Sequence, residues 1–124
     1  MNPQELKTTA LQFLQNSAHG KIEEAYSLVA PNFRHHNPYF AADADALKEG
    51  MRENALHNPD KIFEVQRVLH ETDLVAVHSR VVMPTRQVQI AVVHIFRFEN
   101  GKIAELWDIG QVQPEPMLNQ IGMF

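Results

Sequence analysis

The chain has 124 residues, 44% of them hydrophobic and 21% charged, which is typical of one globular domain spanning residues 1–124 and excludes a disordered chain. Fifteen acidic and eleven basic residues give a net charge of −4, which argues against nucleic-acid binding because no cationic surplus exists to replace counterions. The absence of cysteine excludes disulfide scaffolds, cysteine nucleophiles and thiolate metal sites, whereas seven histidines leave acid–base chemistry and imidazole ligation open.

The beginning of the chain has neither the basic start nor the apolar stretch of a signal peptide. No apolar run approaches the roughly 20 residues that span a bilayer. We therefore expect a cytoplasmic protein that does not bind a membrane.

Two helices are predicted at the start of the chain. The first should begin at Pro3, because Asn2 is a good N-cap residue and proline is favoured at the first helical position. Gly20 is expected to end it. A short second helix fits residues 21–29, with Pro31 just beyond its end.

Residues 32–42 show no regular periodicity and combine aromatic and imidazole side chains, which favours a loop. A third helix should begin near Asp43 or Asp45, although Gly50 within it costs about 1 kcal/mol relative to alanine. The turn Asn58-Pro59-Asp60 should end this helix.

The second half of the chain is rich in strand-forming residues separated by short polar breaks. The predicted strands cover residues 62–70, 74–83, 87–98 and 102–112. Three helices followed by four consecutive strands indicate an α+β domain with an antiparallel meander.

The last hairpin contains Asn100-Gly101 and allows two turns. A two-residue turn pairs Glu99 with Lys102, whereas a three-residue loop with a glycine bulge pairs Phe98 with Lys102. We favour the three-residue loop, because it separates apolar from charged side chains more cleanly between the two faces of the sheet.

In this register His94, Phe96 and Asp108 share one apolar face, with His94 and Asp108 diagonal to each other and about 7–8 Å apart between Cα atoms. One interpretation is a buried pair that only orders the core. The other is a pocket with acid–base chemistry, which we favour because burying such a pair in a core costs stability relative to apolar residues.

Other histidines depend on loop geometry. His78 joins the face of His94 if the break Pro84–Arg86 is a three-residue loop, and another loop length reverses this. His35 and His36 belong either to the rim of a pocket or to an exposed turn. Neither His-x-His nor His-Glu-x-x-His occurs, so no metal site is predicted.

The run from Phe96 to Asp108, the element His36-Asn37-Pro38 and the strand segment 75–79 resemble the SnoaL-like polyketide cyclases. This family belongs to the fold group of nuclear transport factor 2 and ketosteroid isomerase. The resemblance covers essentially the whole chain, and its most specific stretch is residues 96–108.

The resemblance implies a cone-shaped α+β fold, in which three N-terminal helices pack on a curved antiparallel sheet of about four main strands around an apolar pocket. It also implies a homodimer. By position, Asp108 matches the acid–base residue of the cyclases, His94 matches its helper and Asn37 matches a loop residue that reaches substrate. Leu106 stands where many relatives carry histidine, so the substrate is expected to differ.

We therefore expect a cofactor-independent enzyme that removes a proton beside a carbonyl group, as an aldol cyclase or isomerase does. Asp108 and His94 are the expected catalytic residues, and the expected ligand is a small apolar or aromatic carbonyl compound. His36, Asn37, His78 and Phe96 are candidate substrate-binding residues. The rival hypothesis is a non-catalytic ligand-binding domain on the same fold, and a hydrolase or dehydratase using the same pair is a third.

Overall fold

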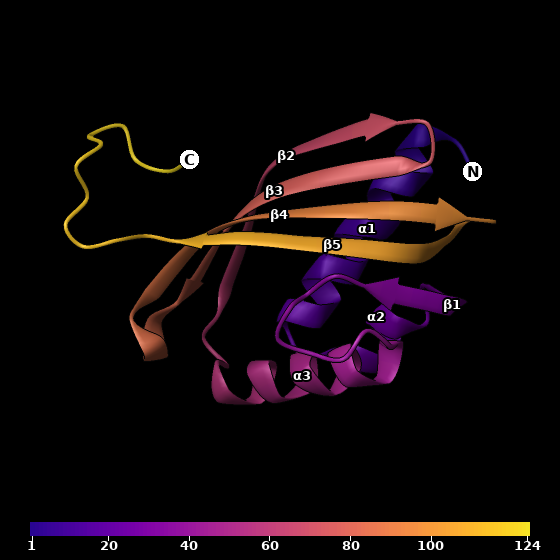
Figure 1. Cartoon of the computed structure of the whole chain (residues 1–124), viewed down its shortest axis with the longest axis horizontal. Helices are drawn as coiled ribbons and strands as arrows, with labels where there is room; N and C mark the ends of the chain where they lie inside the picture. Colours follow the sequence, from indigo (N-terminus) through magenta and orange to yellow (C-terminus); the bar gives the residue numbers. More distant parts are fainter.

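A computed structural model describes all residues, 1–124. Three helices and one strand precede a run of four strands (Figure 1). The elements are α1 (Pro3–Ala18), α2 (Ile22–Tyr26), β1 (Val29–His35), α3 (Ala44–His57), β2 (Ile62–Glu71), β3 (Leu74–Met83), the 3₁₀ turn η1 (Pro84–Arg86), β4 (Val88–Glu99) and β5 (Lys102–Val112). The α+β class predicted from the sequence is confirmed, although one strand lies between the second and third helices.

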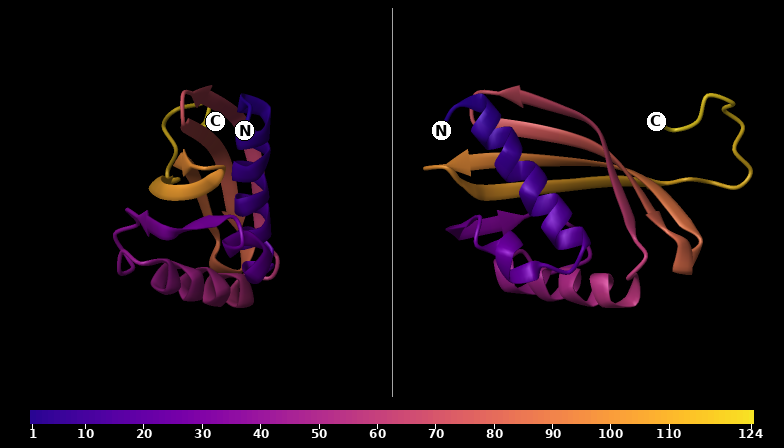
Figure 2. Two further views of the ribbon diagram at one scale, coloured as in Figure 1. Left: turned by 90° about the vertical axis from the view of Figure 1, so that its right-hand side faces the viewer. Right: turned by 180° about the vertical axis from the view of Figure 1, so that it is seen from behind.

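The five strands form one curved sheet in the order β1-β5-β4-β3-β2. Helix α1 crosses the inner, concave face of this sheet, and α3 lies below its lower edge (Figure 2). Both helices begin as predicted, because the side chains of Asn2 and Asp43 accept hydrogen bonds from the backbone N–H groups of Glu5 and Ala46.

Strand β1 was not predicted, and it makes the sheet mixed rather than antiparallel. It pairs in parallel with the edge of β5, where Val29 lies opposite Ile103 and His35 opposite Leu106. Helix α2 is correspondingly shorter than the predicted 21–29. The segment lacks strand periodicity in its sequence, and Pro31 is tolerated because β1 is an edge strand.

The favoured three-residue loop of the last hairpin is wrong. Glu99 pairs with Lys102 around a two-residue turn, and both Asn100 (φ 50°) and Gly101 (φ 77°) adopt the left-handed backbone that a type I′ turn requires. A bulge lies in β5 instead, at Ala104, because Phe98 and Arg97 of β4 pair with Ile103 and Glu105.

The bulge restores the predicted face while changing the pairing. His94 lies directly opposite Asp108 rather than diagonal to it, and Phe96 lies opposite Leu106. Ile103 of β5, opposite Phe98, is fully buried in the core. The extra residue of the bulge therefore allows both Ile103 and Asp108 to point inward.

The β3–β4 connection has four residues, because Met83 pairs with Val88 and Gln87 adopts a left-handed backbone after η1. This length reverses the face predicted for His78. Val77, not His78, lies opposite His94 and is buried on the inner face.

The core fills the space between α1, α2 and the inner face of the sheet. Phe13 of α1 packs edge-on against Phe96 of β4, with ring centroids 5.9 Å apart. Gly50 of α3 also has a packing reason, since a Cβ atom there would overlap the ring of Phe40. This contact holds the loop before α3 against the helix.

Candidate functional site

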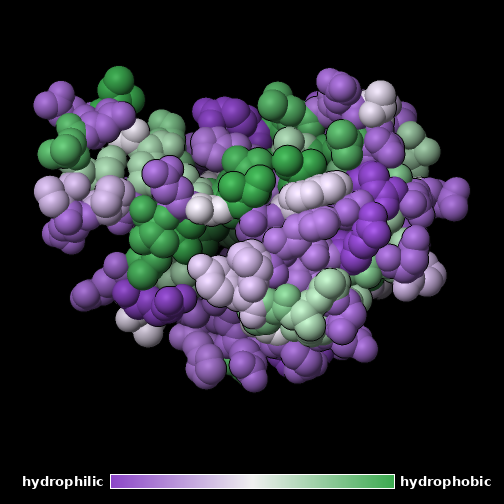
Figure 3. Space-filling model, viewed as in Figure 1, coloured by the Kyte–Doolittle hydropathy of each residue, from purple (hydrophilic) through white to green (hydrophobic).

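A cavity of about 690 Å³ opens between α1, α3, the loop after β1 and the inner face of the sheet. Hydrophobic residues flank a hollow on the molecular surface (Figure 3). Apolar side chains that line the cavity include Leu14, Met51, Phe63, Val92 and Leu106. Because the walls are mainly apolar, its few polar groups decide what it can bind or do.

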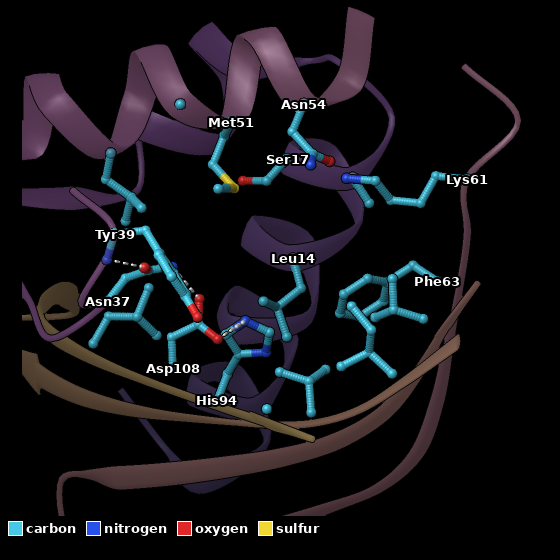
Figure 4. Close-up of a pocket in the computed structure, with 18 of the residues that line it drawn as sticks. Leu14, Ser17, Asn37, Tyr39, Met51, Asn54, Lys61, Phe63, His94 and Asp108 are labelled. Atoms are coloured by element: carbon cyan, nitrogen blue, oxygen red, sulfur yellow. Dashed lines mark hydrogen bonds and ion pairs between the residues drawn. The ribbon is translucent and has the colours of Figure 1, made fainter. Parts of the chain in front are cut away.

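Asp108 of β5 points into this cavity, and its side chain is 22% exposed. Its Oδ2 atom accepts a hydrogen bond of 2.9 Å from the Nδ2 group of Asn37 (Figure 4). The amide of Asn37 is itself oriented, because its Oδ1 atom accepts the backbone N–H of Tyr39 at 3.0 Å. The structure therefore brings the two predicted residues together.

His35 supports this arrangement from behind. Its buried ring donates through Nε2 to the carbonyl oxygen of Ala41, and its Nδ1 accepts the backbone N–H of Asn37 at 3.0 Å. The sequence left His35 undecided between a pocket rim and an exposed turn. The structure makes it a buried residue that fixes the loop presenting Asn37.

His94 of β4 lies beside Asp108, with 3.6 Å between Nε2 and Oδ1. This distance is too long for a hydrogen bond, so the pair is in contact without being locked together. Burial lowers the pKa of His94, and the charge of Asp108 opposes this effect only in part. The imidazole is therefore neutral at pH 7.

The tautomer of His94 follows from its surroundings. Nδ1 is buried without a partner, and Nε2 faces the carboxylate of Asp108. A lone pair on Nε2 would face negative charge, so the proton belongs on Nε2. His94 thus presents a neutral N–H group next to the carboxylate, at the cavity.

Tyr26 of α2 is a site residue that the sequence did not single out. Tyr26 lines the cavity, and its hydroxyl group is buried without a hydrogen-bond partner. Burial and then the charge of Asp108 raise the pKa of Tyr26, so the phenol stays protonated. Only the fold brings Tyr26 of this short helix to the wall of the cavity.

Three of the predicted substrate-binding residues do not line the cavity, namely Phe96, His78 and His36. Phe96 is fully buried in the core beneath His94. His78 points to the outer face of the sheet, where it contacts Arg67 and stacks on Phe124. These positions differ from the expected cavity lining because burial depth and loop length are not visible in the periodicity of the strands.

His36 also lies on the outer face. Its ring stacks on Trp107 at 5.0 Å, and its Nε2 atom contacts Oε2 of Glu105 at 2.6 Å. Together with the guanidinium groups of Arg97 and Arg34, this contact lowers the pKa of Glu105 to about 2. His36 therefore belongs to a charged cluster on the surface and not to the cavity.

No group of three or more histidine, aspartate or glutamate side chains is arranged to hold a metal ion. None of the helices combines the length and the apolar character needed to cross a bilayer.

The sequence model of the SnoaL-like domain matches residues 10–106. No curated protein matches the sequence. Among solved structures, AclR from Streptomyces galilaeus, a proposed hydroxylase, is similar at 23% identity with a TM-score of 0.76, over 89% of this chain and 91% of that one.

Two further structures have the same architecture. One is a proposed polyketide cyclase from Acidithiobacillus ferrooxidans, with 19% identity and a TM-score of 0.74 over 90% of this chain and 92% of that one. The other is a proposed ketosteroid isomerase from Kribbella flavida, with 16% identity and a TM-score of 0.75 over 94% and 85%. These likenesses establish the fold shared with nuclear transport factor 2, and the match over residues 10–106 shows that the chain belongs to the SnoaL-like domain family.

Proposed function

We propose that this protein is an enzyme that removes a proton from a carbon atom next to a carbonyl group, with Asp108 as the base. The observation that carries the proposal is the arrangement of Asp108, Asn37 and His94 at one apolar cavity. A carboxylate that faces a cavity and keeps free acceptor sites can accept a proton from a bound ligand.

The reaction begins with transfer of the α-proton of the ligand to Asp108, which leaves a neutral carboxylic acid and an enolate. The Nε2–H group of His94 donates to the enolate oxygen. Asn37 holds the carboxylate in place through Oδ2, which leaves Oδ1 for the proton. Tyr26 supplies a second neutral donor to the cavity.

The enolate then has two outcomes. In an isomerase, the protonated Asp108 returns its proton to another carbon of the enolate system. In an aldol cyclase, the enolate carbon attacks a second carbonyl group of the same molecule, and the new alkoxide takes the proton from Asp108. Both outcomes restore the carboxylate and need no redox partner.

Neutral donors suit this reaction. A donor that stays neutral stabilises the enolate without first forming an ion pair with the base, and the apolar walls strengthen each hydrogen bond by keeping water away. Positioned acid–base catalysis contributes about 10²–10⁴-fold in rate.

The test is hydrogen exchange at carbon, which needs no knowledge of the product. Aromatic ketones such as 2-tetralone are incubated with the protein in D₂O, and loss of the α C–H signal is followed by NMR. We expect exchange above the buffer rate in the wild type, and a loss of about 10²–10⁴-fold in Asp108→Asn. Asp45→Asn, an exposed position on α3, is the matched control and should exchange like the wild type.

Full exchange activity in a folded Asp108→Asn variant would refute the assignment of the base. Binding of these ketones without any exchange would favour the rival function, a ligand-binding domain that does no chemistry. The homodimer also stays a prediction. It is supported by exposed apolar residues on the outer face of the sheet, such as Leu69 and Ile109, which a second copy would cover.

A further inference from the structure

The cavity has a second polar region, away from Asp108. Lys61, just before β2, extends its side chain into the cavity on the side opposite Asp108 and His94 (Figure 4). Burial, with no acidic neighbour to oppose it, lowers the pKa of this ammonium group. A largely buried cation without an acidic partner is costly, so this site favours a ligand that brings a negative charge.

Two other polar side chains lie on the same side of the cavity. Ser17 of α1 is 6% exposed, and its hydroxyl group is buried without a hydrogen-bond partner. Asn54 of α3 lines the cavity beside it (Figure 4). An unpartnered buried hydroxyl at a cavity wall is a hydrogen-bonding site that a ligand can satisfy.

Charge is therefore divided between the two ends of the cavity. Asp108 is negative at one end, whereas Lys61 and the guanidinium group of Arg86 bring positive charge to the lining elsewhere. An anionic ligand group is repelled from Asp108 and attracted to Lys61. This division would orient a bound molecule with its anion at Lys61 and its reacting carbonyl group at Asp108.

We propose that the substrate is a carbonyl compound with an apolar body and a carboxylate group at its far end, bound by Lys61, Ser17 and Asn54. The identity of the carbonyl end rests on the proposed function, whereas the carboxylate site can be tested by binding alone.

The probes are 4-oxo-4-phenylbutanoate and its homologues with one and two additional methylene groups, each compared with its own methyl ester. The series varies the distance between the ketone and the carboxylate, and the ester removes only the negative charge. We expect at least one acid to bind about ten-fold or more tightly than its ester by isothermal titration calorimetry, because hydrogen bonds to charged groups are the strong ones.

Lys61→Met should remove this preference while leaving the affinity for the ester unchanged, since methionine keeps most of the apolar stem. Lys21→Met is the matched control, because it changes the net charge equally at an exposed position and should keep the preference. Ser17→Ala should reduce the preference in part, and circular dichroism checks that each variant is folded.

The outcomes separate the two proposals. If no acid binds more tightly than its ester, or if Lys61→Met keeps the preference, the carboxylate site is refuted even when Asp108-dependent exchange occurs. If the acids bind through Lys61 but no probe exchanges its α-protons, the carboxylate site stands and the proposed enzyme function fails.

Discussion

Strand β5 carries one carboxylate on each face, and the two have opposite surroundings. Glu105 on the outer face contacts Arg34 at 3.2 Å, Arg97 at 3.0 Å and His36 at 2.6 Å. Asp108 on the inner face accepts one hydrogen bond, from the uncharged amide of Asn37. Both acids belong to the same strand, and their spacing of three residues places them on opposite faces because side chains alternate along a strand.

The difference lies in acceptor capacity. A carboxylate has about four acceptor sites, and three basic neighbours occupy those of Glu105. Such a group holds strands β1, β4 and β5 together and has little left for chemistry. Asp108 keeps acceptor sites open to a cavity, which is the condition for a base. The number of free acceptor sites on a carboxylate therefore indicates whether it can act as a base, in addition to the charge of its neighbours.

The largest expected contrast is between the two acids themselves. Asp108→Asn should lower α-proton exchange by about 10²–10⁴-fold, whereas Glu105→Gln should leave it within two-fold and reduce the free energy of unfolding by about 1–3 kcal/mol. Exchange in D₂O and urea unfolding measure the two quantities. The comparison between the faces breaks down if Glu105→Gln is the inactive variant.

The neighbouring residues His36 and Asn37 give a finer version of the same comparison. Asn37→Ala removes the hydrogen bond that holds Asp108 and should lower exchange by about ten- to one-hundred-fold. His36→Ala should leave exchange unchanged and cost about 0.5–1.5 kcal/mol of stability, since it loses a contact with Glu105. If both variants lowered exchange equally, the site would not be confined to the inner face of the sheet, which would contradict the assignment.

Low pH should weaken the charged cluster that Glu105 forms with Arg34, His36 and Arg97, over a defined range of pH. The pKa of Glu105 falls from its ordinary 4.5 to about 2 on folding, so its stabilising effect is complete above pH 4.5 and is lost as the pH drops toward 2. The difference in unfolding free energy between the wild type and Glu105→Gln should be present at pH 5 and narrow below about 4.5. Urea titrations across this range test it, and a constant difference down to pH 3 would disprove it.

The smallest effect concerns the proton on His94. Burial lowers the pKa of His94 below its ordinary 6.5, so below this pH the unfolded chain binds a proton at His94 more readily than the folded chain does. This difference destabilises the folded state as the pH falls below 6.5. Nitrogen-15 NMR should find His94 neutral at pH 7 with the proton on Nε2. An imidazolium signal at pH 7 would rule out a neutral donor beside Asp108.

Much of the site was visible in the sequence. The alternation of β4 and β5 placed His94 and Asp108 on one apolar face, and the resemblance of His36-Asn37-Pro38 to the SnoaL-like cyclases implied that Asn37 reaches the substrate. The face was right although the turn was wrong, because the bulge in β5 compensates for the shorter turn. The turn and the bulge each shift the register by one residue in the same direction, and the total shift of two residues leaves the faces unchanged because side chains alternate with a period of two.

The sequence by itself determined the helix starts, the four long strands and the shared face of His94 and Asp108, because capping and alternation act between near neighbours in the chain. Only the tertiary structure decided which of the seven histidines reach the cavity, since strand β1, the β3–β4 loop and the core set those directions. It also brought Lys61, Ser17 and Asn54 to one cavity from three distant segments. Local sequence patterns do not predict such contacts between distant segments, because the contacts depend on how the sheet curves and where the helices cover it.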